Sequence, residues 1–138
     1  MLSKKLSAAK PPDETVFFID RSLGIDPIRT ELIKAGLVVE IHDDHFARDE
    51  EDRVWLRTVG DRGWVVLTKD QKLRYRPLEI AALRASKARV FVLTAGNLRG
   101  IEIAAVFLTA LPRIVKVLRS VPGPFVARVS QSGRVTIT

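Results

Sequence analysis

Short apolar segments alternate with helix-like segments along most of this chain. The apolar segments are rich in Val, Ile, Leu and Phe and cover residues 16–19, 37–41, 64–68 and 89–93. Strands of a parallel sheet have this composition because both of their faces are buried. Between them, apolar residues recur at helical spacing, around residues 28–36, 50–59, 77–83 and 101–119. This alternation predicts an α/β fold with a central, mainly parallel sheet of four or more strands.

The two ends of the chain differ from this repeating part. Residues 125–129 and 134–137 are strand-like and flank a Gly-containing turn, which predicts a C-terminal β-hairpin. Pro112 falls inside the last helix and should kink or split it, because proline lacks a backbone donor. Residues 1–14 are basic and then Pro-rich, and we expect a flexible arm there, with residues 15–138 as a single domain.

The charge balance points to a polyanionic partner. The net charge is +7 and the pI is about 10.2, which favours nucleic acid, an acidic protein or an anionic membrane as the binding partner. The chain has no cysteine, so a metal ion would need oxygen or imidazole ligands. The longest apolar-rich stretch, residues 101–111, is too short to cross a bilayer and contains Glu102. We therefore expect a cytoplasmic protein that does not insert into a membrane.

Aspartates follow two of the predicted strands. Asp20 follows the first and Asp70 follows the third, and parallel strands place such residues at one carboxyl edge, where α/β sheets build sites. Two carboxylates there repel one another unless a cation lies between them, and Mg²⁺ or Mn²⁺ suits oxygen ligands. A third acid should come from the helix before the third strand. Asp52 is the favoured residue, with Asp43, Asp44 and Glu51 as alternatives. Acids in a first helical turn also interact favourably with the helix dipole, which alone would explain this cluster.

These segments together resemble the PIN-like nuclease superfamily. Three segments resemble motifs of this family. They are Phe17-Phe18-Ile19-Asp20-Arg21-Ser22-Leu23-Gly24, then Asp52-Arg53-Val54-Trp55-Leu56, and then Gly63-Trp64-Val65-Val66-Leu67-Thr68-Lys69-Asp70. The tail, with Pro124-Phe125-Val126 and Gly133-Arg134-Val135, is similar to that of the VapC-type toxins. The resemblance covers residues 16–137 and implies a PIN-like three-layer sandwich.

The resemblance also implies a function. Members of this family are Mg²⁺- or Mn²⁺-dependent endoribonucleases, and the toxins pair with a small antitoxin and commonly form homodimers. It assigns both metal binding and catalysis to Asp20, Asp52 and Asp70. Many members carry a fourth acid after the fourth strand, where this chain has Thr94-Ala95-Gly96-Asn97. Thr94 or Asn97 would have to supply a polar ligand there instead.

Basic residues surround the third acid. Lys69, Lys72, Arg74 and Arg76 could bind phosphates, and Tyr75 could stack on a base. Arg21, next to the first acid, is a further candidate contact to RNA. A solvated loop with clustered charges is the simpler interpretation of the same pattern.

Three other functions compete with a nuclease. A catalytically degenerate PIN-like module would bind RNA or act in regulation without cutting, and the missing fourth acid favours it. A receiver-like phosphoacceptor domain needs two adjacent acids after the first strand, but Asp20 stands alone there. A dinucleotide-binding oxidoreductase needs a Gly-x-Gly-x-x-Gly motif after that strand, which this chain lacks.

Overall fold

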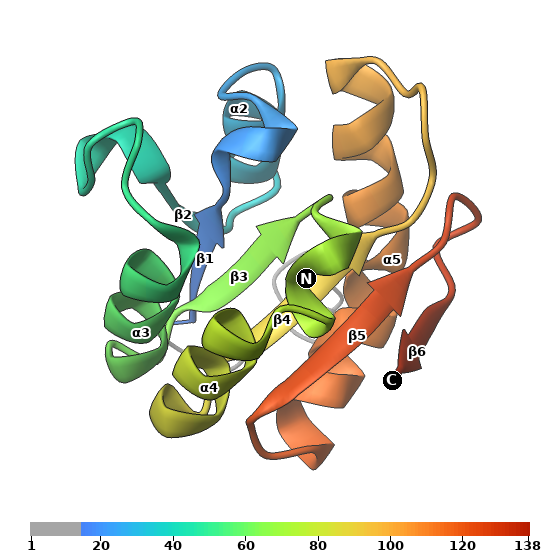
Figure 1. Ribbon diagram of the computed structural model, residues 1–138. Coiled ribbons are helices and arrows are strands. Elements are labelled where there is room, and N and C mark those ends of the chain that lie inside the picture. The colour runs from blue at the N-terminus through green and yellow to red at the C-terminus, as the bar shows by residue number, and fades with distance from the viewer. Residues whose placement is uncertain (1–14) are drawn as a thin grey trace.

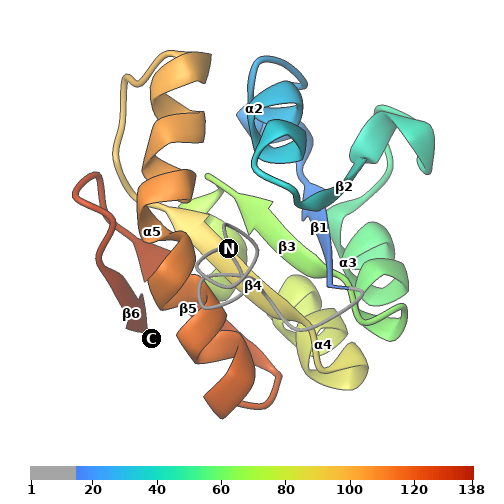
Figure 2. The ribbon, with the colours of Figure 1, turned by 180° about the vertical axis from the view of Figure 1, so that it is seen from behind.

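Six strands form one sheet with helices on both faces in the computed structural model, which describes residues 15–138 (Figures 1 and 2). The predicted arm of residues 1–14 lies outside the described residues. The strands are β1 (Val16–Ile19), β2 (Val38–Ile41), β3 (Val65–Thr68), β4 (Arg89–Leu93), β5 (Phe125–Val129) and β6 (Val135–Ile137). The α-helices are α2 (Ile28–Lys34), α3 (Asp52–Asp61), α4 (Pro77–Ser86) and α5 (Gly100–Ser120), and the 3-10 turns are η1 (Arg21–Leu23), η2 (His42–Asp44) and η3 (Gln71–Arg74).

The strand order is β2-β1-β3-β4-β5-β6, and only β6 runs antiparallel to its neighbour. The chain moves from β1 to β2 on one side and then returns to place β3 on the other side of β1. The connections that leave β1 and β3 therefore diverge above their carboxyl ends. Ligands of open α/β sheets bind at such a switch point.

The two faces of the sheet have separate cores. Helices α2 and α5 cover one face, where Phe17, Ile19 and Phe91 are buried. Helices α3 and α4 cover the other, where Phe18 and Val66 are buried. Successive strand residues point to opposite faces, so continuous apolar strands supply both cores. This three-layer arrangement confirms the predicted α/β class.

The predicted strands agree with the structure to within a residue at each end, and the C-terminal hairpin is confirmed as β5 and β6. The hairpin joins the sheet by parallel pairing of β5 with β4. Of the two expected effects of Pro112, a kink or a split of the last helix, the split does not occur, because α5 runs unbroken through it. Pro112 lies on the exposed side, whereas Ala110 and Ile114 on either side of it are buried against the sheet. Their packing holds both halves of the helix in place despite the missing hydrogen bond.

Candidate active site

Asp20 is buried at the carboxyl end of β1. Pairing of Ile19 with Leu67 brings it beside the end of β3, and only 8% of its surface is exposed. Its Oδ2 atom accepts hydrogen bonds from Ser22 Oγ at 2.8 Å and from Thr68 Oγ1 at 2.7 Å. The carboxylate is therefore held in one orientation by two hydroxyl groups.

Asp70 follows β3 and begins η3. Its Oδ1 atom accepts the backbone N–H of Lys72 at 3.0 Å, which caps the turn. Its own N–H donates to Thr68 Oγ1 at 3.0 Å. Thr68 thus connects the first and third acids through one hydroxyl.

Asp52 is the first residue of α3, where a carboxylate also interacts favourably with the helix dipole. Its Oδ1 atom accepts the indole N–H of Trp55 at 2.9 Å. Trp55 is almost fully buried beside Phe18, so it is a rigid anchor for this carboxylate.

Arg76 links the remaining carboxylate oxygens. Its Nη1 atom lies 3.2 Å from Asp52 Oδ2, 3.0 Å from Asp70 Oδ2 and 3.2 Å from Glu79 Oε1. The pKa of Arg76 is raised above its ordinary value, chiefly by the hydrogen bond to Glu79 and then by the charge of Asp70. A guanidinium therefore neutralises acids that would otherwise repel one another.

The three aspartates line one open cavity of about 540 Å³, here called the acid cavity. Its other lining residues are Ser22, Lys69, Gln71, Lys72 and Arg76. It lies where the connections from β1 and β3 diverge, which is the expected site position in this architecture. Paired acids and free lysines in one cavity suit a cation together with a phosphate.

A family model described as "PIN like domain" matches residues 15–95, which include all three aspartates. The chain belongs to the PIN-like domain family. "Putative ribonuclease VapC45" of Mycobacterium tuberculosis (strain ATCC 25618 / H37Rv) is 27% identical to this PIN-like domain over 124 residues, or 87% of this chain and 89% of that protein. No solved structure gives a significant match. Within residues 15–138, no helix is both long and apolar enough to cross a membrane.

The alternative third acids of this PIN-like domain do not line the acid cavity. Asp43 lies in η2, and its Oδ1 atom pairs with Arg21 Nε at 2.8 Å. Glu51 pairs with Arg53 at 2.6 Å, and Asp44 is exposed. Asp52 alone among the candidates for this position lies in one cavity with Asp20 and Asp70.

The predicted RNA contacts separate into three groups. Lys69, Lys72 and Arg76 line the acid cavity. Arg74 and Tyr75 instead line a neighbouring cavity, between η3, α4 and β5. Arg21 also donates to the backbone carbonyl of Arg48 at 3.4 Å, besides pairing with Asp43, so its side chain holds two loops together.

The polar residues after β4 are also outside the acid cavity. Thr94 Oγ1 donates to the carbonyl oxygen of Val129 at 3.2 Å, which fastens the end of β4 to β5. Asn97 occupies a turn with φ of 60°, a conformation that asparagine tolerates better than most residues. Their placement favours structural roles for both.

Several site residues were missed in the sequence. The sequence alone gave Ser22 no role in the site, but its hydroxyl binds Asp20. Trp55 was given no role either, although its position three residues after Asp52 on a helix could have suggested the contact. Glu79, three residues after Arg76, is a further acid near the cavity. Glu79 was missed because we looked for a fourth acid after β4, whereas Glu79 lies on α4.

The donor chemistry of the acid cavity fits a hard divalent cation, since its ligands are carboxylates and hydroxyls. Nevertheless, no group of three or more His, Asp or Glu side chains within residues 15–138 is arranged so that it could hold one metal ion. The position of Arg76 explains this, because its guanidinium already binds Asp52 and Asp70. An ion at this site would have to replace Arg76 between those carboxylates.

Proposed function

We propose that this PIN-like domain is a Mg²⁺- or Mn²⁺-dependent endoribonuclease and the toxin of a type II toxin–antitoxin pair. The observation that carries the proposal is the convergence of Asp20, Asp52 and Asp70 on one cavity beside Lys69 and Lys72. The relative's name supports a ribonuclease of the VapC type. The proposal includes RNA as substrate, an antitoxin protein as partner, a homodimer and action in the cytoplasm.

Asp20, Asp52 and Asp70 would hold the divalent ion. When bound, that ion lowers the pKa of a water molecule and neutralises charge on the scissile phosphate. Ser22 and Thr68 orient the carboxylate of Asp20 through their hydroxyl groups. Trp55 fixes Asp52 through its indole N–H. These neighbours keep the acids in position without occupying all of their oxygen atoms.

Cations of the chain bind the RNA backbone in this proposal. Lys69 and Lys72 make no ion pair within residues 15–138 and are free to contact phosphates. To hold the divalent ion, Asp52 and Asp70 would have to release Arg76, and its guanidinium would then be free to contact a phosphate. Glu79 keeps Arg76 close to the cavity throughout, because the two are three residues apart on the first turn of α4.

The decisive experiment is cleavage of cellular RNA by the purified protein with Mg²⁺, with Mn²⁺ and with a chelator. We expect metal-dependent cleavage that Asp20→Asn and Asp70→Asn each abolish, because an amide is a poorer ligand for a hard cation. Asp61→Asn is the control, since Asp61 lies at the far end of α3 and pairs with Arg57. Undiminished cleavage by both site variants would overturn the assignment.

A second candidate function is RNA binding without cleavage. The absence of a preformed ion-binding group in residues 15–138 favours it. It predicts that the wild-type protein binds RNA equally well with chelator and with Mn²⁺, and cuts in neither condition.

A further inference from the structure

The face of β5 on the α4 side carries no helix. Figure 1 shows α3 and α4 lying over the β1–β4 part of the sheet, while β5 lies beyond them. On this face, β5 presents Val126, which packs into the core under α4, and then Arg128, which is exposed. A strand this far inside the sheet is ordinarily apolar on both faces. Arg128 therefore marks a surface that solvent or a ligand reaches.

Two adjoining cavities lie over this uncovered face, and we call them together the β5 groove. The larger, of about 410 Å³, is lined by Arg74, Tyr75, Ile80, Leu83, Arg84, Pro124, Phe125, Val126 and Thr138. The narrower is a crevice with no room for a water molecule, and it is bordered by Gln71, Arg74, Val92, Thr94, Val126 and Arg128. Arg74 and Val126 line both cavities. Gln71 borders both the narrow cavity and the acid cavity, so the β5 groove lies next to the acid cavity on the protein surface.

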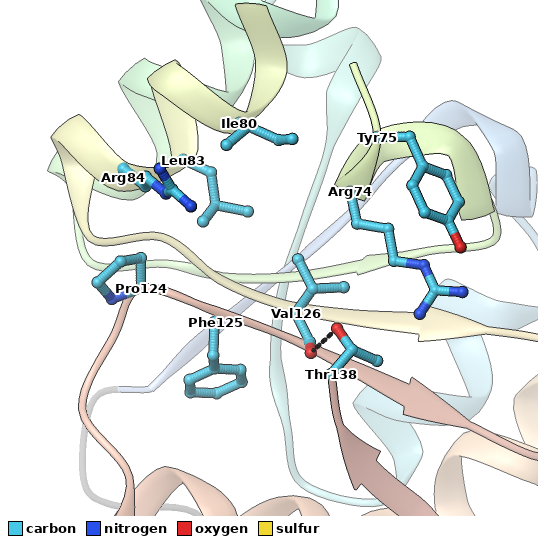
Figure 3. A pocket seen from close by; sticks show the side chains of 9 residues that line it. All are labelled: Arg74, Tyr75, Ile80, Leu83, Arg84, Pro124, Phe125, Val126 and Thr138. Atoms are coloured by element: carbon cyan, nitrogen blue, oxygen red, sulfur yellow. Dashed lines mark hydrogen bonds between the residues drawn. The ribbon is translucent and has the colours of Figure 1, made fainter. Parts of the chain in front are cut away.

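The walls of the β5 groove are basic. Figure 3 shows Arg84 on one side of the larger cavity and Arg74 on the other, with Val126 pointing into the space between them. Arg128 adds a third cation in the narrow cavity. Among the residues that the structure describes, no Asp or Glu side chain lines either cavity. Within residues 15–138, none of the three arginines forms an ion pair.

The floor and one rim can accept a flat apolar group. Val126 and Leu83 form an apolar floor, and Tyr75 at the rim is 66% exposed. The guanidinium of Arg74 lies 4.8 Å from the centre of the Tyr75 ring. An aromatic ring backed by arginine is a stacking platform for bases, and the arginines suit the phosphates between them.

From these observations we propose that the β5 groove binds single-stranded RNA, holding nucleotides next to the bond cut in the acid cavity. This proposal rests on the proposed function, and it adds Arg84 and Arg128 to the residues that contact the substrate. Neither was singled out in the sequence, since they are distant from the three aspartates along the chain. Single-stranded RNA fits better than duplex, because the bases must be free to stack.

The test measures binding separately from cleavage. A fluorescein-labelled 12-nucleotide RNA is titrated with wild type, Arg84→Gln, Arg128→Gln and the double variant, in chelator, by fluorescence anisotropy. We expect each single change to weaken binding about three- to tenfold and the double change to weaken it further. The slope of log affinity against log salt should shrink by about 0.7 for each lost phosphate contact. Circular dichroism melts establish that all variants are folded.

Lys116→Gln is the matched control. It removes one exposed positive charge from α5, on the opposite side of the sheet, and should bind RNA as wild type does. Equal affinities for the groove variants, the control and the wild type would overturn the proposal. The same proteins are also titrated with an oligoglutamate of the same charge as the RNA. If the groove variants lose as much affinity for this peptide as for RNA, an acidic protein segment and not RNA is the favoured occupant.

Cleavage assays on the same proteins separate the two proposals. A wild type that binds RNA through Arg84 and Arg128 but cuts nothing supports the β5 groove and contradicts the nuclease assignment. A wild type that cuts RNA, with groove variants that bind and cut normally, contradicts the β5 groove alone.

Discussion

Thr68 is the residue on which the geometry of the acid cavity most depends. Its hydroxyl donates to Asp20 and accepts the backbone N–H of Asp70, so two acids share one support. It is fully buried, and therefore no water can replace the lost bonds without rearrangement. The position of two proposed metal ligands is thus set by a residue that need not touch the substrate.

The change Thr68→Val tests this support. Valine has nearly the same shape but no hydroxyl, so Asp20 and the Asp70 N–H each lose a partner. We expect cleavage to fall at least about tenfold and the free energy of unfolding to fall by about 1–3 kcal/mol. Thr68→Ser keeps the hydroxyl and should retain most of the cleavage. Urea unfolding measures the stability of each variant. Equal cleavage by the valine and serine variants would contradict the role of the Thr68 hydroxyl in positioning the two acids.

In the proposed function, Arg76 competes with a divalent ion for Asp52 and Asp70. The change Arg76→Met removes this competitor, so the variant should bind Mn²⁺ roughly tenfold more tightly. Without metal, it should be less stable than wild type, because the two carboxylates lose their neutralising cation. Calorimetric titration and the rise in melting temperature on adding Mn²⁺ measure both effects. Arg76→Lys retains the charge and is the control, and identical Mn²⁺ affinities in all three proteins would exclude competition.

At the scale of elements, the helix α3 owes its position to close packing against α4. Gly60 lies where a Cβ atom would overlap the Oγ and Cβ atoms of Ser86 and approach the Ala88 Cβ to 3.1 Å. Ser86 cannot move freely, since it is buried and donates to the carbonyl of Ala82. Because α3 also carries Asp52, this contact sets where the second acid lies.

The change Gly60→Ala should therefore separate the two helices. We expect a loss of about 1–3 kcal/mol in unfolding free energy, which is typical of overpacking, together with weaker cleavage. Gly96→Ala is the control, because a Cβ there meets nothing within 4 Å. Urea unfolding measures the stability of both variants. Equal stability would show that α4 can move away from the added Cβ atom without loss of unfolding free energy.

The start of α5 gives the fold a dependence on acid pH. The backbone N–H of Arg99 donates to Glu102 Oε1 at 2.8 Å, and this bond and then the Arg99 side chain hold the pKa of Glu102 below its ordinary value. A lowered pKa stabilises the folded state above the unfolded pKa of about 4.3, and this contribution is lost as the pH falls through the folded pKa. Glu102→Gln should accordingly lose less stability than wild type between about pH 5 and pH 3. Parallel stability curves for the two proteins would contradict this contribution.

The sequence predicted the elements better than it predicted the contacts between them. Buried parallel strands are continuous apolar runs, so residues 16–19 and 89–93 were located correctly, and Asp20 and Asp70 followed from the strand ends. The contacts of Arg76 and Glu79 depend on how η3 meets α4. Arg128 depends on the register of β5 with β4, and an isolated strand pattern does not contain that register.

At the scale of the whole molecule, the positive charges differ in whether a nearby carboxylate neutralises them. Near the carboxyl edge of the sheet, Asp43 pairs with Arg21, and Asp52 and Asp70 pair with Arg76. Lys69, Lys72 and the arginines of the β5 groove have no carboxylate partner within residues 15–138. The net charge of +7 therefore contributes to attraction of a polyanion at this edge. The same edge holds the acid cavity, which all three aspartates line.

The central position of β1 in the sheet determines when, during synthesis of the chain, the acid cavity can form. Phe17 pairs with Val65, so the first strand lacks this neighbour until about half of the chain has been synthesised. Asp20 and Asp70 are then drawn together by the same event that closes β1 onto β3. The strand β5, with Arg128, is made near the end of synthesis and is followed only by β6. During much of the second half of translation, the growing chain therefore contains all three aspartates but still lacks Arg128, and we expect it to bind RNA more weakly than the finished protein does.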